Sequence, residues 1–313
     1  MRIGIGIGVG VGEGGNIGQL MEQAKRAEAD GFASVWMANI FSYDAIMSLA
    51  LAGQATERVE LGTFVVPTYP RHPTALAQQA LTAAAATGGR FTLGIGLSHK
   101  VVIEDMFGLD YSKPVRHMRE YLSVLNPLLA GEAVRFRGEE YRVAAQITVA
   151  DAAKPPVIVA ALGPQMLRLA GKMADGTATW MGGPKYLAGT AVPAITQAAA
   201  EAGRSAPRIV SGFPIAVTTK REEALQSASQ VFAVYGTLPS YRAVLDIEGA
   251  ADASGVAIVG DEAEVERRLR ELSEAGVTDL NGSPFPVPGD PEAASRTRAF
   301  LAELARSGLG VGA

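Results

Sequence analysis

VELGTFVVPTYPRHPTALAQQALTAAAATGGRFTLGIG, residues 59–96, contains two short apolar runs separated by one alanine-rich segment. The runs at 59–66 and 90–96 combine β-branched and large apolar residues, which is typical of strands. Pro73 suits the first turn of a helix between them, because that turn leaves its amide hydrogens unpaired. A strand, a helix and a second strand in this order predict two parallel neighbours in one sheet.

The same alternation continues in both directions along the chain. Further strands are predicted at 2–9, 33–39, 155–161, 175–182, 207–217 and 276–285, and further helices at 16–31, 43–55, 114–130, 163–174, 185–203, 220–248, 261–275 and 291–306. Eight strands, each followed by helical sequence, fit a (β/α)8 TIM barrel. Because no linker-like stretch divides the chain, we expect one barrel domain over residues 1–313.

Two segments interrupt the repeat. Residues 133–150 contain RGEE between alternating residues, which predicts an antiparallel hairpin inserted before the fifth strand. A second, helical insertion is expected at about 236–256.

Composition excludes several classes of function. The chain has no Cys and only three His, so thiolate chemistry is excluded and no metal site is expected. The net charge of −4 comes without a basic tract, which argues against nucleic acid as a partner. No signal peptide and no membrane span is expected, so we predict a cytoplasmic protein that acts on a small molecule.

The N-terminal GVGEGG, residues 10–15, matches the dinucleotide-binding template G-x-G-x-x-G. That motif also needs an acidic residue at the end of the next strand, and residues 31–43 contain no Asp or Glu. The glycines instead occupy every even position from Gly4 to Gly12, which is the period of a strand. We therefore predict that Gly4, Gly6 and Gly8 face a crowded barrel interior.

The active site of a parallel barrel lies at the C-terminal ends of its strands. Here those positions are poor in charge: they fall at 39–41, 64–68, 96–99, 161–165 and 180–182. Without a carboxylate pair or a Ser-His-Asp set, the protein is expected to orient a bound cofactor that carries the reaction. The segments GIGLSH and LGPQM could hold a phosphate through backbone amides and a helix N-terminus.

Three stretches carry a family resemblance: residues 59–100, EDMFGLDYSKPVRHMREYL at 104–122, and AALGPQMLRLAGKMADGTATW at 160–180. They resemble the bacterial-luciferase-like flavin and deazaflavin oxidoreductases, most of all the methylenetetrahydromethanopterin reductase branch that uses coenzyme F420. The resemblance implies a (β/α)8 barrel, a homodimer, and F420 as cofactor, with FMN as the alternative. It also implies a cofactor ring against a bulge after the third strand, with a cis peptide at Phe64-Val65.

The resemblance also assigns the cofactor-binding residues. They are Phe64, Val65 and Val66 at the bulge, Gly96, Leu97, Ser98 and His99 after the fourth strand, Leu162, Gly163, Pro164, Gln165 and Met166 after the fifth, and Trp180 after the sixth. Met166 is also expected to pack in the core.

The chain departs from the family at one place. Sugar-phosphate dehydrogenases of the superfamily carry Asp-His after the second strand, whereas this chain has Asn39-Ile40. That leaves Asn39 and His99 as the candidate catalytic residues, His99 being either a proton donor or a ligand of the cofactor phosphate or a backbone carbonyl. Of the other histidines, His72 is expected at the entrance of the third helix or at the rim of the pocket, and His117 on a solvated helix face.

Three functions remain open. The first is an F420-dependent oxidoreductase that moves a hydride to or from a C=C, C=N or CH–NH group. The second is an FMN-dependent two-component monooxygenase. The third is a barrel that binds a flavin or deazaflavin without turnover.

Overall fold

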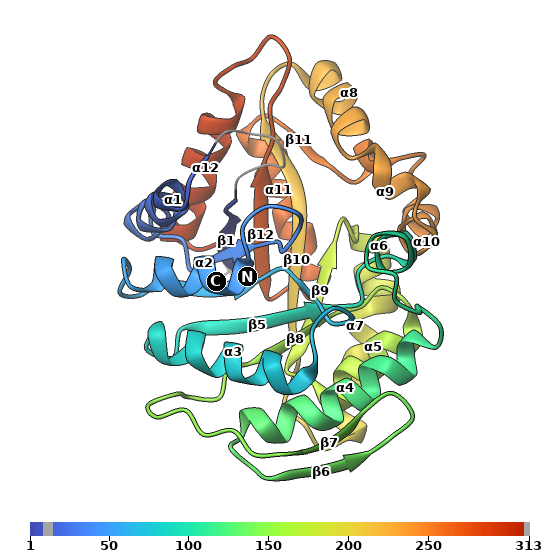
Figure 1. Ribbon diagram of the computed structural model, residues 1–313. Helices are drawn as coiled ribbons and strands as arrows, with labels where there is room; N and C mark the ends of the chain where they lie inside the picture. The colour runs from blue at the N-terminus through green and yellow to red at the C-terminus, as the bar shows by residue number, and fades with distance from the viewer. Residues whose placement is uncertain (9–14, 310–313) are drawn as a thin grey trace.

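Eight parallel strands form a closed barrel surrounded by helices in the computed structural model, which describes residues 1–8 and 15–309 (Figure 1). Around the barrel the order is β10-β12-β1-β2-β3-β5-β8-β9, and β9 pairs with β10 to close it. The bounds are β1 Arg2–Gly6, β2 Ser34–Met37, β3 Glu60–Thr63, β5 Phe91–Gly96, β8 Val157–Ala160, β9 Gly176–Trp180, β10 Arg208–Val217 and β12 Asp279–Pro284. The predicted fold class is confirmed.

Helices connect the barrel strands. They are α1 Ile17–Asp30, α2 Ala45–Gly53, α3 Pro73–Ala86, α4 Pro114–Leu129, α5 Pro164–Met173, α6 Pro184–Tyr186, α7 Val192–Glu201, α8 Arg221–Val231, α9 Ala233–Thr237, α10 Pro239–Glu248, α11 Glu262–Glu274 and α12 Ala293–Ser307, with single turns at Val102–Met106, Leu187–Ala191 and Ala253–Gly255. The helix ends follow the local sequence. Asn16 and Gln19 form a capping box at the start of α1, and Gly31 ends it in the left-handed conformation at φ 91°.

Among the described residues, four further strands lie outside the eight strands of the barrel order. β6 Val134–Arg137 and β7 Arg142–Ala145 pair antiparallel, as predicted, and lie beside α4. β11 Ile258–Gly260 pairs with the far end of β10 and was not predicted, because a three-residue run is too short for a periodic pattern. β4 Val66–Pro67 continues the line of β3 after the bulge and pairs with β5.

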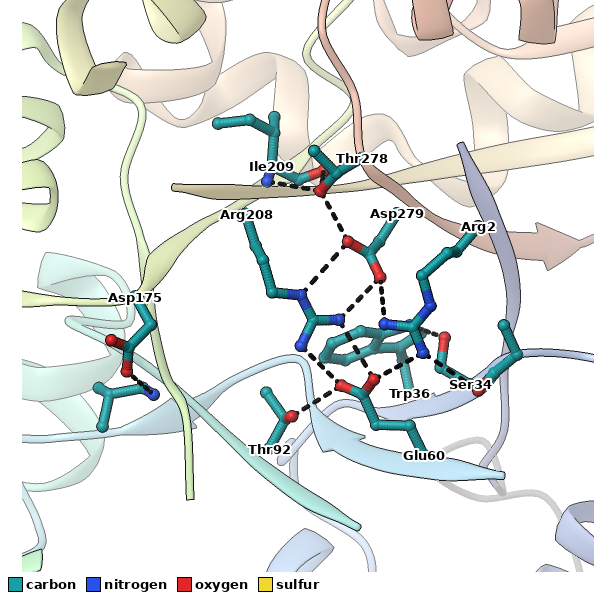
Figure 2. Close-up of polar contacts among 12 residues, drawn as sticks. Arg2, Ser34, Trp36, Glu60, Thr92, Asp175, Arg208, Ile209, Thr278 and Asp279 are labelled. Atoms are coloured by element: carbon teal, nitrogen blue, oxygen red, sulfur yellow. Dashed lines mark hydrogen bonds and ion pairs between the residues drawn. The ribbon is translucent and has the colours of Figure 1, made fainter. Parts of the chain in front are cut away.

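A network of charged side chains lies at the N-terminal ends of the barrel strands (Figure 2). Arg208 donates to Glu60 Oε1 at 2.9 Å and to Asp279 Oδ1 at 2.7 Å, and Arg2 donates to the same two carboxylates. Burial alone would raise the pKa of Glu60, but Arg208 and Arg2 hold it below its usual value. These side chains fill this end of the barrel, so the opposite end is the place to look for a site.

The glycines of β1 face the interior, as predicted for Gly4 and Gly6. A Cβ on Gly4 would lie 2.3 Å from Ser34 Oγ, which accepts a hydrogen bond from the Trp36 indole at 2.9 Å. The Trp36 ring also fills the space above Gly62, where a Cβ would lie 2.2 Å from it. The bare face therefore accommodates one large buried side chain. Gly8 lies beyond the end of the strand in open space, and 10–14 of the G-x-G-x-x-G stretch lie outside the described residues.

Candidate active site

The bulge after β3 is fixed to the neighbouring strand. The Phe64-Val65 peptide is cis, at the bond that the resemblance implied. Just before it, the Thr63 hydroxyl accepts a hydrogen bond from Gly94 N and donates one to Gly94 O, both at 2.7 Å. This reciprocal pair sets the position at which the chain leaves β3.

Phe64 and Val65 cover the barrel interior on the side of the C-terminal ends of the strands. The Val65 side chain occupies the space above Gly96, where a Cβ would lie 2.7 Å from Val65 Cγ2. The Phe64 ring crosses the barrel to Gly212 on β10, where a Cβ would lie 3.0 Å away, and meets Trp36 edge-on at 6.1 Å. Gly96 thus has a packing function in this structure, as the surface on which the bulge rests.

The segment after β5 presents Leu97, Ser98 and His99, all half-buried. Ser98 adopts a left-handed conformation at φ 61°, and its carbonyl accepts a hydrogen bond from the Tyr111 hydroxyl at 3.3 Å. Burial lowers the pKa of His99, so its imidazole is neutral at pH 7. A neutral imidazole can accept a proton or donate a hydrogen bond, but it does not supply a positive charge.

The N-terminus of α5 offers unpaired amides. Gly163 is the N-cap, has no side chain to accept their hydrogen bonds, and a Cβ there would meet nothing within 4 Å. Pro164 has no amide hydrogen, so the free donors of the first turn belong to Gln165 and Met166. Met166 is buried, as expected, and the carbonyl of Leu162 is held by the Tyr186 hydroxyl at 2.7 Å. An anion can bind at such a helix start.

Two buried polar atoms on the barrel strands lack partners among the described residues. They are Trp180 Nε1 on β9 and Asn281 Oδ1 on β12. Both residues are in register with Gly212 on the strand between them. Trp180 was predicted from the sequence as a site residue, but Asn281 was not, although Asp279, Asn281 and Ser283 share one face of the eighth strand.

Comparison with known proteins decides the family. The model of the family described as "Luciferase-like monooxygenase" matches residues 1–279. The chain belongs to this family. A 5,10-methylenetetrahydromethanopterin reductase of Archaeoglobus fulgidus is 29% identical over 303 residues, covering 85% of this chain and 90% of the relative.

Solved structures share the fold of this luciferase-like protein. The coenzyme F420 dependent tetrahydromethanopterin reductase of Methanopyrus kandleri superposes with a TM-score of 0.81, at 22% identity over 99% of each chain. The oxygenating constituent of 3,6-diketocamphane monooxygenase from Pseudomonas putida, in complex with FMN, superposes with a TM-score of 0.77, at 16% identity over 100% of this chain and 99% of that one. The family model and the reductase relatives make this a family of oxidoreductases.

Asn39 holds the loop after β2 in this luciferase-like chain. Its Oδ1 accepts hydrogen bonds from Ala45 N at 3.0 Å and from Arg71 Nη2 at 3.4 Å, and Arg71 also pairs with Asp44 at 2.8 Å. These contacts anchor the loop that exposes Ile40 and Phe41. Asn39 Oδ1 therefore accepts hydrogen bonds from Ala45 and Arg71, and none from His99.

His117 is buried, so the prediction that it is solvated is wrong. Its Nε2 lies 3.0 Å from Thr68 Oγ1, and its ring stacks on Tyr69 at 3.8 Å. Arg116 and Arg119 lie near it in the sequence and indicate a solvated helix face, but His117 lies on the buried side of α4 and contacts Thr68 and Tyr69. His72, in contrast, is exposed and caps α3 by accepting a hydrogen bond from Thr74 N.

Burial of His117 predicts a pH-dependent stability. Burial lowers its pKa to about 4, whereas in the unfolded chain the value is near 6.5. The unfolded state therefore binds the proton first, so the stabilisation is complete above pH 6.5 and is lost as the pH falls toward 4. We expect His117 to contribute about 3 kcal/mol to this fall.

Urea unfolding of wild type and His117→Gln at pH 7 and pH 4.5 measures the contribution. Gln retains a polar group opposite Thr68 but does not titrate, so the variant should lose less stability on acidification than wild type. His72→Gln is the matched control at an exposed histidine and should behave as wild type. Equal pH dependence in all three proteins would contradict the prediction.

A separate cleft of about 340 Å³ lies at the C-terminal ends of β10 and β11. Its lining includes Thr218, Lys220, Asp290 and Arg296, and contains none of the predicted site residues. Asp290 bonds both Thr218 and Arg296, so the polar groups there largely satisfy each other.

Proposed function

We propose that this protein is an F420-dependent oxidoreductase that transfers a hydride between the reduced deazaflavin and a C=C, C=N or CH–NH group of a small organic substrate. Deazaflavin has a carbon in place of the flavin N5, so when bound it supplies hydride transfer and reacts poorly with oxygen. The chain's own residues bind the cofactor, orient it and keep water from the reacting atoms.

The observation that carries the proposal is the character of the strand ends. They combine apolar side chains, a neutral His99 and the uncapped start of α5. This set suits an uncharged ring together with a phosphate-bearing tail. A Mycobacterium tuberculosis relative named as a putative coenzyme F420-dependent oxidoreductase, 35% identical over 169 residues, supports F420 over FMN.

The proposed roles follow from position. Phe64, Val65 and Val66 would lie against the ring, with Trp180 at its side. Leu162, Gly163, Pro164, Gln165 and Met166 would hold the phosphate of the tail, and Gly96, Leu97 and Ser98 would line the path between. His99 would hydrogen-bond the cofactor or exchange the substrate proton. Asn39 would act by positioning its loop at the edge of the site.

Titration of the purified protein with oxidised F420 and with FMN tests the proposal. We expect saturable F420 binding at least 100-fold tighter than FMN binding, followed by anaerobic oxidation of reduced F420 when a substrate is added. Preference for FMN would instead favour the two-component monooxygenase. Tight F420 binding without oxidation across a broad panel of unsaturated substrates would favour the binding protein.

A further inference from the structure

Five aromatic side chains form a continuous row between the ends of β5 and β9. His99 lies 5.9 Å from Tyr241, Tyr241 lies 4.9 Å from Tyr235, Tyr235 lies 6.1 Å from Trp180, and Trp180 lies 6.0 Å from Phe232, measured between ring centroids. Neighbouring rings meet at 54° to 63°, so they pack tilted or edge-on and do not form a parallel stack. We call this row the aromatic wall.

The wall carries hydrogen-bonding atoms that the protein leaves unused. Trp180 Nε1 is buried and has no partner among the described residues. The imidazole of His99 and the hydroxyls of Tyr235 and Tyr241 likewise make no hydrogen bond to another described residue. A buried donor without an acceptor is unfavourable and rare in folded proteins, so the indole N–H indicates an acceptor that arrives with a ligand.

The wall is also electrically neutral. Burial lowers the pKa of His99 and raises the pKa of Tyr235, with no charged side chain contributing to either change. Burial is likewise the main cause of the raised pKa of Tyr241, followed by its tyrosine neighbours. Trp180, Phe232, Tyr235 and Tyr241 pack against the apolar side chains of Met181, Leu245 and Val256. A charged ligand would lose its hydration here without gaining a counter-charge.

We propose that the aromatic wall is the substrate-binding surface, and that it takes a flat, uncharged, conjugated molecule whose carbonyl or imine accepts a hydrogen bond from Trp180 Nε1. This inference rests on the proposed function, because it assigns the substrate side of the same site. The rings supply contact area for a planar molecule, and the single indole N–H fixes the orientation of its polar group.

The origin of the wall supports a role in specificity. Tyr235 lies on α9, Tyr241 lies on α10, and Phe232 joins α8 to α9, so all three come from the segment between β10 and β11. This segment is longer than one barrel helix, and α10 packs against α6 beside the end of β9 (Figure 1). Residues outside the repeating β/α units can vary without disturbing the barrel, which suits a surface that selects the substrate.

Calorimetric titration with three probes tests the inference. Menadione is flat, uncharged and has two carbonyl acceptors, 2-methylnaphthalene lacks the acceptors, and 2-naphthoate is charged. We expect wild type to bind menadione at least tenfold more tightly than 2-naphthoate. Trp180→Phe retains a ring but lacks the N–H, so it should bind menadione about fivefold more weakly and 2-methylnaphthalene as wild type does. Phe300→Leu, on α12 outside the wall, is the control and should change neither.

Each titration is repeated in the presence of saturating oxidised F420. Equal affinity of wild type for menadione and 2-naphthoate, or equal menadione affinity in wild type and Trp180→Phe, overturns the inference. Displacement of menadione by F420 also overturns it, because the wall would then belong to the cofactor. If F420 does not bind but the probe pattern holds, the proposed function fails and the assignment of the wall stands.

Discussion

Gly94→Ala is expected to lower the free energy of unfolding by about 3 kcal/mol. A Cβ on Gly94 would lie 1.9 Å from the carbonyl oxygen of Thr63, which is backbone and cannot rotate away. The added methyl group would have to push β3 and β5 apart. It would also break the two hydrogen bonds between Thr63 Oγ1 and Gly94 that hold the start of the bulge. Equilibrium unfolding in urea measures the change.

Gly163→Ala is the matched control for Gly94→Ala. A Cβ there meets nothing within 4 Å, and its φ of −83° is available to alanine. We expect a change in unfolding free energy within about 0.5 kcal/mol. Because the bulge lies in the proposed ring site, any folded Gly94→Ala protein should also bind F420 more weakly. An unchanged urea midpoint for Gly94→Ala would contradict the close approach of β3 and β5.

Gly163→Asp is expected to weaken F420 binding about 100-fold, which corresponds to about 2.7 kcal/mol. The carboxylate would cap the free amides at the start of α5 and would repel the phosphate proposed to bind there. Asp is a favoured N-cap residue, so the substitution should leave the fold intact or stabilise it slightly. Fluorescence titration measures the affinity.

Two comparisons isolate the charge. Gly163→Asn can cap the same amides without a negative charge, so it should weaken F420 binding only about tenfold. The deazaflavin riboside that lacks the phosphate should bind wild type and Gly163→Asp equally. If Asp and Asn weaken F420 binding to the same extent, charge repulsion plays no part. If the riboside is weakened as much as F420, the phosphate does not bind at α5.

Local pattern was enough to predict most of the barrel. The strands and helices were placed from apolar runs, capping residues and glycine stops, as at Asn16 and Gly31, because these signals act within a few residues. The cis peptide at Phe64-Val65 followed from a resemblance in the surrounding motif. The glycine face of β1 was read correctly as a packing feature, since alternation is a property of the strand itself.

The three-dimensional arrangement decided which of the predicted residues meet. Gly96 and Gly163 look alike as glycines after strands, but only contacts across the barrel place Val65 over Gly96 and leave Gly163 open. The arginines near His117 in the sequence predicted a solvated histidine, but its side chain packs against Thr68 and Tyr69. The row of rings from His99 to Phe232 joins residues more than 100 positions apart. Such contacts depend on barrel closure and packing, which no short stretch of chain encodes.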